Sequence, residues 1–539
     1  MAPNNTPSSD DDRAPPGTVF LTENDGSRGN NLVLHPTPTS DPNDPLNWSS
    51  ARKTINFLPV LAMTALVFTQ LTIPTTFWQL WVVDLDCEYT DLTTALALMF
   101  VGTSTGCFFF IPFAIKYGRR PVYIVSVAFL AGMAIWSARM NSLLELFASQ
   151  LIGGLASATN ETIAQMTIAD LFFVHQRGTV SGLYMAMVMI GNFLGPIIAG
   201  AMARTGDWRL CYYTLFGVNS ALLVYFICLY EESKYTPHLQ GHTHASAHSQ
   251  EKPGEEEEED EVTGQGEKAV SQPTMTQETH IDTSLPLLPW SQRLRLITKT
   301  DENLLKCAYE PFIMLVKFPA VLYTAVEYSF SLCWITMIIS TTSSTFPRPP
   351  YNFSPLGVGN MSLGPFIGCI LGAVYGGYLG DRLIVCLSRR NNGCYEPEMR
   401  LHLLHLPAVC MGGGVLIYGV TLARGLHWIY PSVGGGIFGF GVGTICDITL
   451  ALVIDSYREV TGEAFVVVAF FRNVTSIGIL FALDPWQKAQ GLQNMFIVAA
   501  CLATFIAFFH IPLIKWGKRI RQATSSDYRR MVAKKGNRR

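Results

Sequence analysis

The stretch that decides the fold reads Gly191-Asn-Phe-Leu-Gly195-Pro196-Ile-Ile-Ala-Gly200. It lies in an apolar run from about 180 to 202, and roughly 20 such residues cross a bilayer as a helix. Gly191, Gly195 and Gly200 carry no side chain, which lets a second helix approach closely. Pro196 removes one backbone donor and bends the helix. The stretch therefore predicts a kinked membrane helix with one tightly packed face.

The composition of the whole chain also indicates a membrane protein. Of its 539 residues 49% are hydrophobic and 15% are charged, against roughly a quarter charged in an ordinary soluble domain. This composition excludes a conventional soluble enzyme. The 12 cysteines are scattered without a CxxC pair, so neither a disulfide framework nor a structural zinc is expected. The polar N-terminus lacks a short apolar core, so we expect no cleavable signal peptide.

Twelve apolar windows are long enough to cross a bilayer. They lie at about 54–81, 93–112, 122–140, 143–170, 180–202, 210–230, 318–341, 356–380, 401–422, 428–455, 464–483 and 495–514. The fold class is therefore an all-α membrane protein with twelve transmembrane helices. The windows divide the chain into an N-terminal segment 1–53, a six-helix bundle 54–230, a loop 231–317, a second bundle 318–514 and a basic tail 515–539.

The basic residues set the orientation of these helices, because Lys and Arg near helix ends are retained in the cytoplasm. If the N-terminus is cytoplasmic, the outer loops hold only Arg139, Arg204, Arg209, Arg348, Arg424 and Lys488. Both termini are therefore predicted to be cytoplasmic. The 231–317 loop then lies inside, and its acidic run 255–260 leads us to expect that it is largely disordered. An apolar stretch at about 304–317 is expected to lie along the inner membrane face.

The two groups of six helices carry matching features, which suggests an internal repeat. The fourth span ends with Asp170 and the tenth with Asp455. Each of these acids is followed shortly by an arginine, Arg177 or Arg458. Two halves related in this way are the plan of many secondary transporters.

Several motifs then make the chain, from about 41 to 516, resemble the major facilitator superfamily, specifically its fungal twelve-helix drug:proton antiporters. They are Asp41-Pro-Asn-Asp-Pro-Leu-Asn-Trp48, Tyr117-Gly118-Arg119-Arg120-Pro121, Gly377-Tyr-Leu-Gly-Asp381-Arg382 and the stretch 191–200, which looks like the family's antiporter motif of helix five. The resemblance implies two pseudo-symmetric six-helix bundles, the major facilitator fold, around a central cavity. It also associates the helix-five motif with export rather than uptake.

Two positions depart from the family pattern. Ile115 stands where the loop motif usually has an Asp, which weakens the expected first-half ionic latch. Ser149 stands four residues before Gly153, where many drug antiporters carry an Arg. The resemblance therefore supplies no proton-relaying arginine at this place.

Charge inside the hydrocarbon layer costs several kcal/mol unless it is paired or hydrated, so each such residue is a functional candidate. Glu161 lies nine residues before Asp170, hence on the order of 13 Å from the inner surface. Glu327, Asp447 and Arg472 reach similar depths in their spans. Together they predict a polar site with three acids and one base that binds a proton or a cation.

Glu327 is the first choice for the residue that couples transport to protons. Tyr323, Ser331 and Trp334 share its helical face and offer hydrogen bonds and an aromatic wall. The alternative interpretation is that Arg472 only neutralises one acid to hold two helices together.

Charged residues at the inner ends of the helices form a second group. Pairs there can hold the cytoplasmic side shut and break when the halves rock. The alternative is ordinary solvation of helix ends. The candidates for this gating role are Arg119, Arg120, Asp170, Arg177, Asp381, Arg382, Asp455 and Arg458.

Other chemistry is not indicated. No P-loop, GxSxG or HExxH motif is present, so neither an ATP-driven pump nor a membrane enzyme is predicted. His402 and His405 lack a nearby Glu or Cys, and we expect no metal, no other cofactor and no nucleic acid. Asn352-Phe-Ser354 is a sequon in a short outer loop, but Pro355 and the nearby membrane disfavour its glycosylation.

These observations lead to one functional hypothesis and two alternatives. As the family implies, we expect proton-coupled export of a small organic compound, such as a secondary metabolite, toxin or drug, by a monomer in the plasma membrane. Its partners are then that substrate, protons and the lipid bilayer. Uptake of an organic cation such as a polyamine is the leading alternative, favoured by the three acids. A nutrient receptor that binds without transporting is the other.

Overall fold

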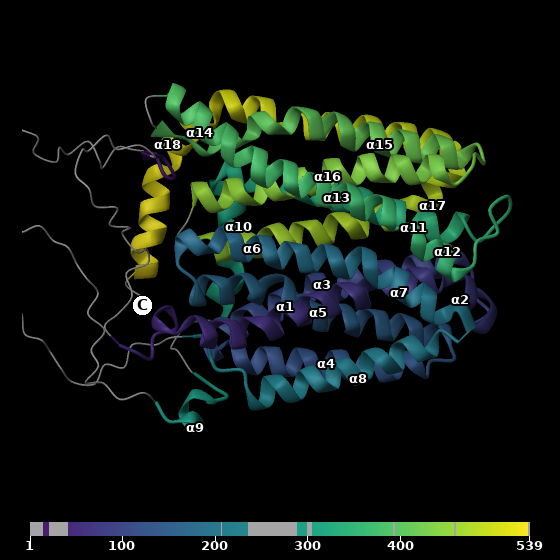
Figure 1. Cartoon of the computed structure of the whole chain (residues 1–539), viewed down its shortest axis with the longest axis horizontal. Coiled ribbons are helices and arrows are strands. Elements are labelled where there is room, and N and C mark those ends of the chain that lie inside the picture. The colour runs from purple at the N-terminus through teal and green to yellow at the C-terminus, as the bar shows by residue number, and fades with distance from the viewer. Residues whose placement is uncertain are drawn as a thin grey trace, which may run out of the picture.

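The computed structural model consists almost entirely of helices arranged in two groups (Figure 1). It describes residues 15–20, 41–205, 207–234, 288–298, 304–391, 394–457 and 460–536. The acidic run 255–260 and Arg458 lie outside the described residues. The group coloured purple to teal, the N-terminal half, lies below the group coloured green to yellow, the C-terminal half, in Figure 1.

The N-terminal half is built from six spans, one of which contains a π-helical turn. Its elements are α1 (Ser50–Thr76), α2 (Trp78–Asp84), α3 (Tyr89–Tyr117), α4 (Arg119–Ala138), α5 (Leu143–Leu171), α6 (Val174–Met189), η3 (Ile190–Leu194), α7 (Gly195–Met202), η4 (Ala203–Thr205) and α8 (Arg209–Cys228). The fifth span runs through α6, η3 and α7. The short helix η2 (Pro45–Asn47) precedes α1.

The C-terminal half repeats this plan. Its elements are α11 (Pro319–Thr345), α12 (Pro355–Asn360), α13 (Leu363–Val374), η5 (Tyr375–Leu379), α14 (Gly380–Arg390), η6 (Pro397–Leu404), α15 (His405–Ala423), α16 (Ile429–Ser456) and α17 (Thr461–Ala507). The eighth span runs from α12 to α14 and contains a second π-helical turn, η5.

The helices are consistent with twelve membrane crossings. Within the described part of the chain, ten helical stretches are long and apolar enough to cross a membrane. One of them holds the eleventh and twelfth spans, because α17 is interrupted by Gly491, whose φ of 75° and ψ of 160° are not helical. The helix α5 is not among the ten, but its 29 residues are long enough, and polar residues such as Asn160 and Glu161 lower its hydropathy.

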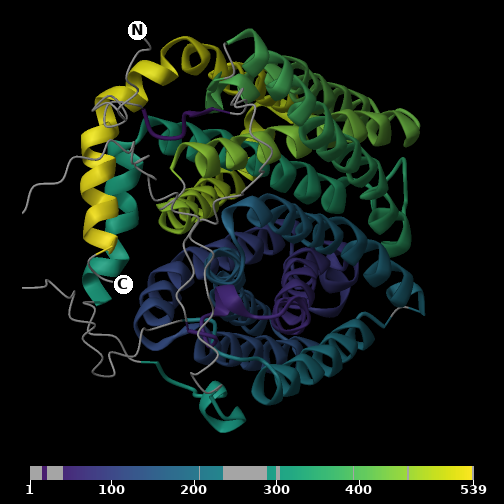
Figure 2. The ribbon, with the colours of Figure 1, turned by 60° about the vertical axis from the view of Figure 1, so that its left-hand side comes forward.

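Three helices lie outside the two bundles, at the end where the spans meet the loop 231–317. They are α9 (Trp290–Arg293), α10 (Leu304–Lys317) and α18 (His510–Gly536). Following the predicted orientation we call this the inner end; it is on the left in Figure 1. The helix α18 crosses the direction of the spans there, and Figure 2 shows it beside α10. The 3.5 Å ion pair between Lys317 and Asp527 lies where these two helices meet.

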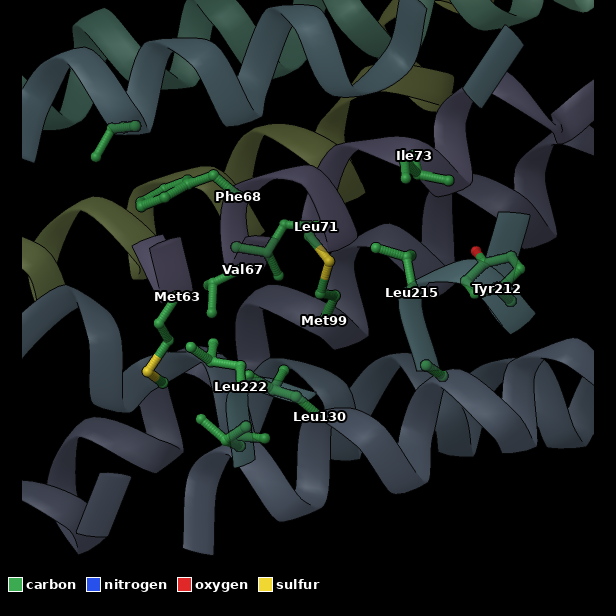
Figure 3. Close-up of a cluster of buried hydrophobic side chains, with 14 of the residues drawn as sticks. Met63, Val67, Phe68, Leu71, Ile73, Met99, Leu130, Tyr212, Leu215 and Leu222 are labelled. Carbon is green, nitrogen blue, oxygen red and sulfur yellow. The ribbon is translucent and has the colours of Figure 1, made fainter. Parts of the chain in front are cut away.

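Each half has its own apolar core. The first core is centred on α1, α3, α4 and α8, and the second on α11, α15, α16 and α17. Figure 3 shows part of the first, in which Met63, Val67 and Leu71 of α1 cluster with Leu130 of α4 and Leu222 of α8. Separate cores let each half move as a unit.

Glycines bring two helices into direct backbone contact inside each half. In the N-terminal half, a Cβ on Gly102 of α3 would overlap the carbonyl oxygen of Leu151, and one on Gly154 of α5 would overlap that of Met99. The same contact recurs between α13 and α16, where a Cβ on Gly368 would overlap the carbonyl of Gly436. The second and fourth spans thus pack as the eighth and tenth do, which agrees with the internal repeat.

This packing predicts opposite results for two neighbouring glycines. Gly154→Val should destabilise the protein by about 1–3 kcal/mol, because the added side chain has no space against α3. Gly153→Val is the matched control, since a Cβ there meets nothing within 4 Å. The measurement is the thermal midpoint of each purified variant in detergent. Equal losses for both variants would show that the close contact between α3 and α5 is not what limits stability.

Candidate functional site

A buried ion pair joins the two halves at the centre of the bundle. Arg472 of α17 donates through Nη2 to Oε1 of Glu161 on α5. Both side chains are almost fully buried. Asn473 holds the pair in place, because its Nδ2 donates to Oε2 of Glu161 at 3.1 Å. Its Oδ1 also accepts from Nε and Nη2 of Arg472 at 3.1 and 2.8 Å.

Polar groups from three more helices surround this pair. The Thr64 hydroxyl of α1 lies 3.0 Å from Oδ1 of Asn160 on α5. Tyr184 of α6 donates its hydroxyl to the Asn160 carbonyl at 3.4 Å. Tyr184 and Tyr328 of α11 both interact electrostatically with Glu161 and with Arg472. The centre therefore combines one ion pair with amides and phenols from both halves, which suits a polar ligand.

Glu327 of α11 is in a different situation. It is 1% exposed, and neither carboxylate oxygen has a hydrogen-bond partner among the described residues. The buried Tyr323 hydroxyl and Trp334 Nε1 also have no partner within the described chain, so they do not make the hydrogen bonds to Glu327 that the helical face suggests. Ser331 donates to the backbone carbonyl of Glu327 at 2.8 Å, not to its carboxylate. Glu327 is thus a buried acid that no counter-charge contacts in the described part of the chain.

Asp447 of α16 lies in the same half as Glu327. Its Oδ2 is 3.0 Å from the position that a Cβ on Gly376 would occupy, so it faces the π-helical turn η5. Asp447 and Glu327 both interact electrostatically with Cys446. Of the four charged residues placed at mid-depth by the sequence, the structure therefore brings Glu161 and Arg472 into contact and leaves Glu327 outside that pair.

A cavity lies between the halves on the outer side of the ion pair. It has about 580 Å³ of empty space, part of it open to solvent. None of the described residues that line it is charged. Its polar groups come from Thr75, Thr76, Asn192, Thr342, Ser343, Ser362 and Tyr418. The hydroxyls of Thr342 and Tyr418 are 2.6 Å apart. Such walls suit a largely apolar compound with a few hydrogen-bonding groups.

The glycines of the stretch 191–200 lie against two other helices. A Cβ on Gly191 would come within 2.6 Å of the Ala65 carbonyl of α1, and one on Gly195 within 2.9 Å of Thr69. A Cβ on Gly200 would come within 2.6 Å of the Pro355 carbonyl in the other half. Pro196 is the second residue of α7, which follows the π-helical turn η3. This stretch therefore packs closely against α1 and across the interface between the halves.

At the inner end of the N-terminal half, Asp170 pairs with Arg119 at 3.0 Å. Both residues belong to the same half, so this pair does not bridge the halves. The Glu232 carboxylate accepts from the backbone N–H groups of Arg119 and Arg120 at 2.9 and 3.1 Å. Burial is the largest influence on Glu232 and raises its pKa, although these hydrogen bonds act in the opposite direction. The side chain of Arg177 lies outside the described residues.

At the inner end of the C-terminal half, Asp455 pairs with Arg400 at 2.8 Å and accepts a hydrogen bond from the Tyr395 hydroxyl. Burial and Asp455 both raise the pKa of Tyr395, which keeps its hydroxyl protonated. Arg382 stacks over the Tyr378 ring at 4.6 Å. The side chain of Asp381 is outside the described part of the chain. Among the described residues, the predicted gating acids thus take arginines of their own half as partners.

Sequence reasoning missed several of these residues. Asn160 and Asn473 directly neighbour the charged residues Glu161 and Arg472, and an amide beside a charge inside an apolar span is a signal that could have found them. Tyr328 carried no such signal, and Tyr184 stood out only as one of several aromatic residues in the apolar spans that would suit a ring-bearing solute. Their role depends on how four helices meet.

The chain is similar to known membrane proteins along most of its length. The family model described as Major Facilitator Superfamily matches residues 60–482. Protein HOL1 of Saccharomyces cerevisiae is 28% identical over 93% of this chain and 92% of its own length. A protein of the same yeast named as the probable drug/proton antiporter YHK8 is 24% identical over 93% of this chain and 90% of its own.

A solved structure shows the same fold. It is the xylose transporter XylE of E. coli in a partially occluded inward open conformation, with a TM-score of 0.56 and 11% sequence identity. The match covers 85% of this chain and 98% of that one. The predicted pair of six-helix bundles is therefore confirmed.

The central ion pair predicts a non-additive mutational pattern. Glu161→Gln or Arg472→Gln alone should cost about 3–5 kcal/mol, because each leaves one buried charge without its partner. The double variant should cost less than the sum of the two, since it removes both charges. Thermal midpoints of the purified proteins measure this. Lys488→Ala is the control: its 2.7 Å pair with Asp484 is exposed and should change stability by about 1 kcal/mol or less. Additive losses would argue against a coupled pair.

Proposed function

Because the chain belongs to the Major Facilitator Superfamily, we propose that it exports a small organic compound in exchange for protons, by alternating access of its two halves. The family makes the protein a multi-pass membrane transporter. We further propose the coupling ion, the direction of transport, the kind of substrate and the residues that take part. We place it in the plasma membrane as a monomer. Both termini are then in the cytoplasm, which is the orientation that the distribution of Lys and Arg favours.

The observation that carries the proposal is the contrast between two buried acids. Glu161 has a guanidinium and an amide as partners. Glu327 is equally buried and has no hydrogen-bond partner among the described residues. An ionised carboxylate without a partner has nothing to offset its desolvation. We therefore assign to Glu327 the binding of the coupling proton.

The central ion pair can couple ligand binding to the conformational change of the two halves. Glu161 belongs to one half and Arg472 to the other, so separating α5 from α17 requires their contact to break. As Glu161 and Arg472 separate, a substrate with polar groups can replace the hydrogen bonds and the charge interaction that either residue loses. Binding of the substrate beside the ion pair then lowers the free energy of the conformational change. A ligand must affect the two conformations differently in this way to be coupled to the change.

Export and the type of substrate are supported by two further observations. The stretch 191–200 resembles the antiporter motif, and the relative YHK8 is named as a probable drug/proton antiporter. The cavity between the halves has uncharged walls with scattered hydroxyl and amide groups. A secondary metabolite, toxin or drug with an apolar body and few polar groups fits such walls.

Uptake of an organic cation such as a polyamine is the second candidate. It is favoured by the same Glu327, because a buried carboxylate without a partner can take an ammonium group instead of a proton. Ser149, at the place where many drug antiporters carry an arginine, also favours it. Under this proposal the net flux of substrate has the opposite sign.

The sign of the flux and its dependence on Glu327 can be measured in one experiment. Transporter-deficient yeast expressing the chain is loaded with a panel of organic cations and neutral aromatic metabolites, with and without a proton uncoupler. We expect lower retention that the uncoupler abolishes. Glu327→Gln should reduce the uncoupler-sensitive flux by about a hundredfold, the lower end of what removal of a proton-transfer group costs.

Asp484→Asn is the matched control, since Asp484 is an acid of α17 that pairs only with the exposed Lys488 among the described ion pairs. It should leave the flux unchanged. Higher retention of an organic cation would replace export by cation uptake. Full uncoupler-sensitive flux in Glu327→Gln would remove Glu327 from the proton path.

A further inference from the structure

A short segment near the N-terminus is docked on the C-terminal half. Residues Val19–Phe20 form strand β1, which pairs antiparallel with β2 (Cys394–Tyr395) between α14 and η6. Val19 lies opposite Tyr395 and Phe20 opposite Cys394. In Figure 2 this purple segment lies among green and yellow elements. The segment belongs in sequence to the N-terminal half, since α1 begins at Ser50, but it is bound by the other half.

Gly17 fits the segment against the end of α16. Its φ is +83°, a backbone conformation that residues with a side chain rarely adopt. A Cβ at this position would come within 2.5 Å of the Asp455 carbonyl oxygen and 2.9 Å of the Ser456 Cα. Glycine is therefore needed at position 17 for two reasons: the positive φ of the turn and the close approach to the end of α16.

Arg521 of α18 provides the polar anchor. It is 1% exposed, and its Nε and Nη2 donate to the two carboxylate oxygens of Glu398 at 2.8 and 2.6 Å. Its remaining Nη1 donates to the Pro16 carbonyl and lies 3.4 Å from the Thr18 hydroxyl. Glu398 thus fixes the guanidinium so that its free edge points at the backbone of the segment. Recognition of backbone in this way is typical of sites that bind extended peptides.

The docking site coincides with a charged cluster at the inner end. Tyr395, which supplies the β2 pairing partner of Val19, also donates to Asp455. Arg400 donates to the same Asp455 oxygen at 2.8 Å. The segment therefore contacts the inner end of α16 and the middle of α18, next to the start of η6, and its presence favours the arrangement of these elements that it contacts.

We propose that the inner face of the C-terminal half is a peptide-binding site whose ligand is the extended segment Pro15–Phe20 of the same chain, and that docking of this segment restrains the opening between the halves. The segment is continuous in sequence with the N-terminal half, so its docking places part of that half's chain on the inner end of the other half. This inference does not depend on the substrate or on the direction of transport.

A disulfide tests the docking. Phe20→Cys places a thiol opposite the native Cys394, and Cα atoms paired across antiparallel strands are within the separation that a disulfide spans. Membranes carrying the full chain with Phe20→Cys are oxidised, and the 20–394 link is quantified by peptide mass spectrometry. We expect a high yield. Val19→Cys is the matched control, because its partner is Tyr395 and no link to Cys394 should form in comparable yield.

The rate at which a native cysteine, Cys107, is labelled measures how far docking of the segment restrains the opening between the halves. Cys107 of α3 is 2% exposed and is packed against Val466 and Phe470 of α17, at the interface between the halves. A maleimide can label it only when the inner side opens. Labelling of Cys107 should be severalfold slower in oxidised Phe20→Cys than in reduced Phe20→Cys that also carries Gly17→Val, in which docking is weakened. Cys211, buried within the N-terminal core, is the internal reference and should label equally in both.

The outcomes separate the two parts of the proposal. Gly17→Val added to Phe20→Cys should lower the yield of the link by about tenfold, because it imposes strain on the docked segment. A low yield in Phe20→Cys alone, with the variant expressed at the membrane, would overturn the docking site. A high yield with equal labelling of Cys107 in oxidised Phe20→Cys and in reduced Phe20→Cys with Gly17→Val would overturn the restraint.

Discussion

The contact between Glu161 and Arg472 is the interaction on which the rest of the structure depends. Two charges near the middle of a bilayer are tolerated only when they are paired or hydrated, and here each half supplies one of them. Asn473 satisfies both partners, so the pair is held by hydrogen bonds as well as by charge. Each half has its own apolar core, and this pair adds a polar link to the apolar contacts between the two, such as that of Cys107 with Val466.

The pair can form only because the helices approach closely. Gly102 and Gly154 let α3 and α5 meet backbone to backbone, and Gly191 and Gly195 do the same between the fifth span and α1. In a membrane, removal of side chains from a helix face strengthens association, since lipid already solvates apolar groups and close packing is what remains. Glycine-rich faces thereby position α5, and with it Asn160 and Glu161, within reach of α17.

The two acids Glu161 and Glu327 have the same side chain and similar depth, but their different surroundings in the folded protein give them different roles. Both are glutamates in apolar spans, and the sequence placed them at similar depth. One faces a guanidinium across the interface, whereas the other faces no partner among the described residues. The inner ends show the same effect: Asp170 and Asp455 have arginine partners from their own halves, Arg119 and Arg400, that do not lie next to them in sequence. Pairs of this kind stabilise each half rather than join the two.

The sequence by itself determined the class of fold, the twelve spans, the repeat and the identity of the buried charges. It could do so because a bilayer demands long apolar helices and penalises every charge within them. The tertiary structure decided which charges meet, that Tyr184 and Tyr328 join the centre, and that Pro15–Phe20 binds the opposite half. These are contacts between residues far apart in the chain, and their partners follow from how the helices are rotated and packed, which no local pattern specifies.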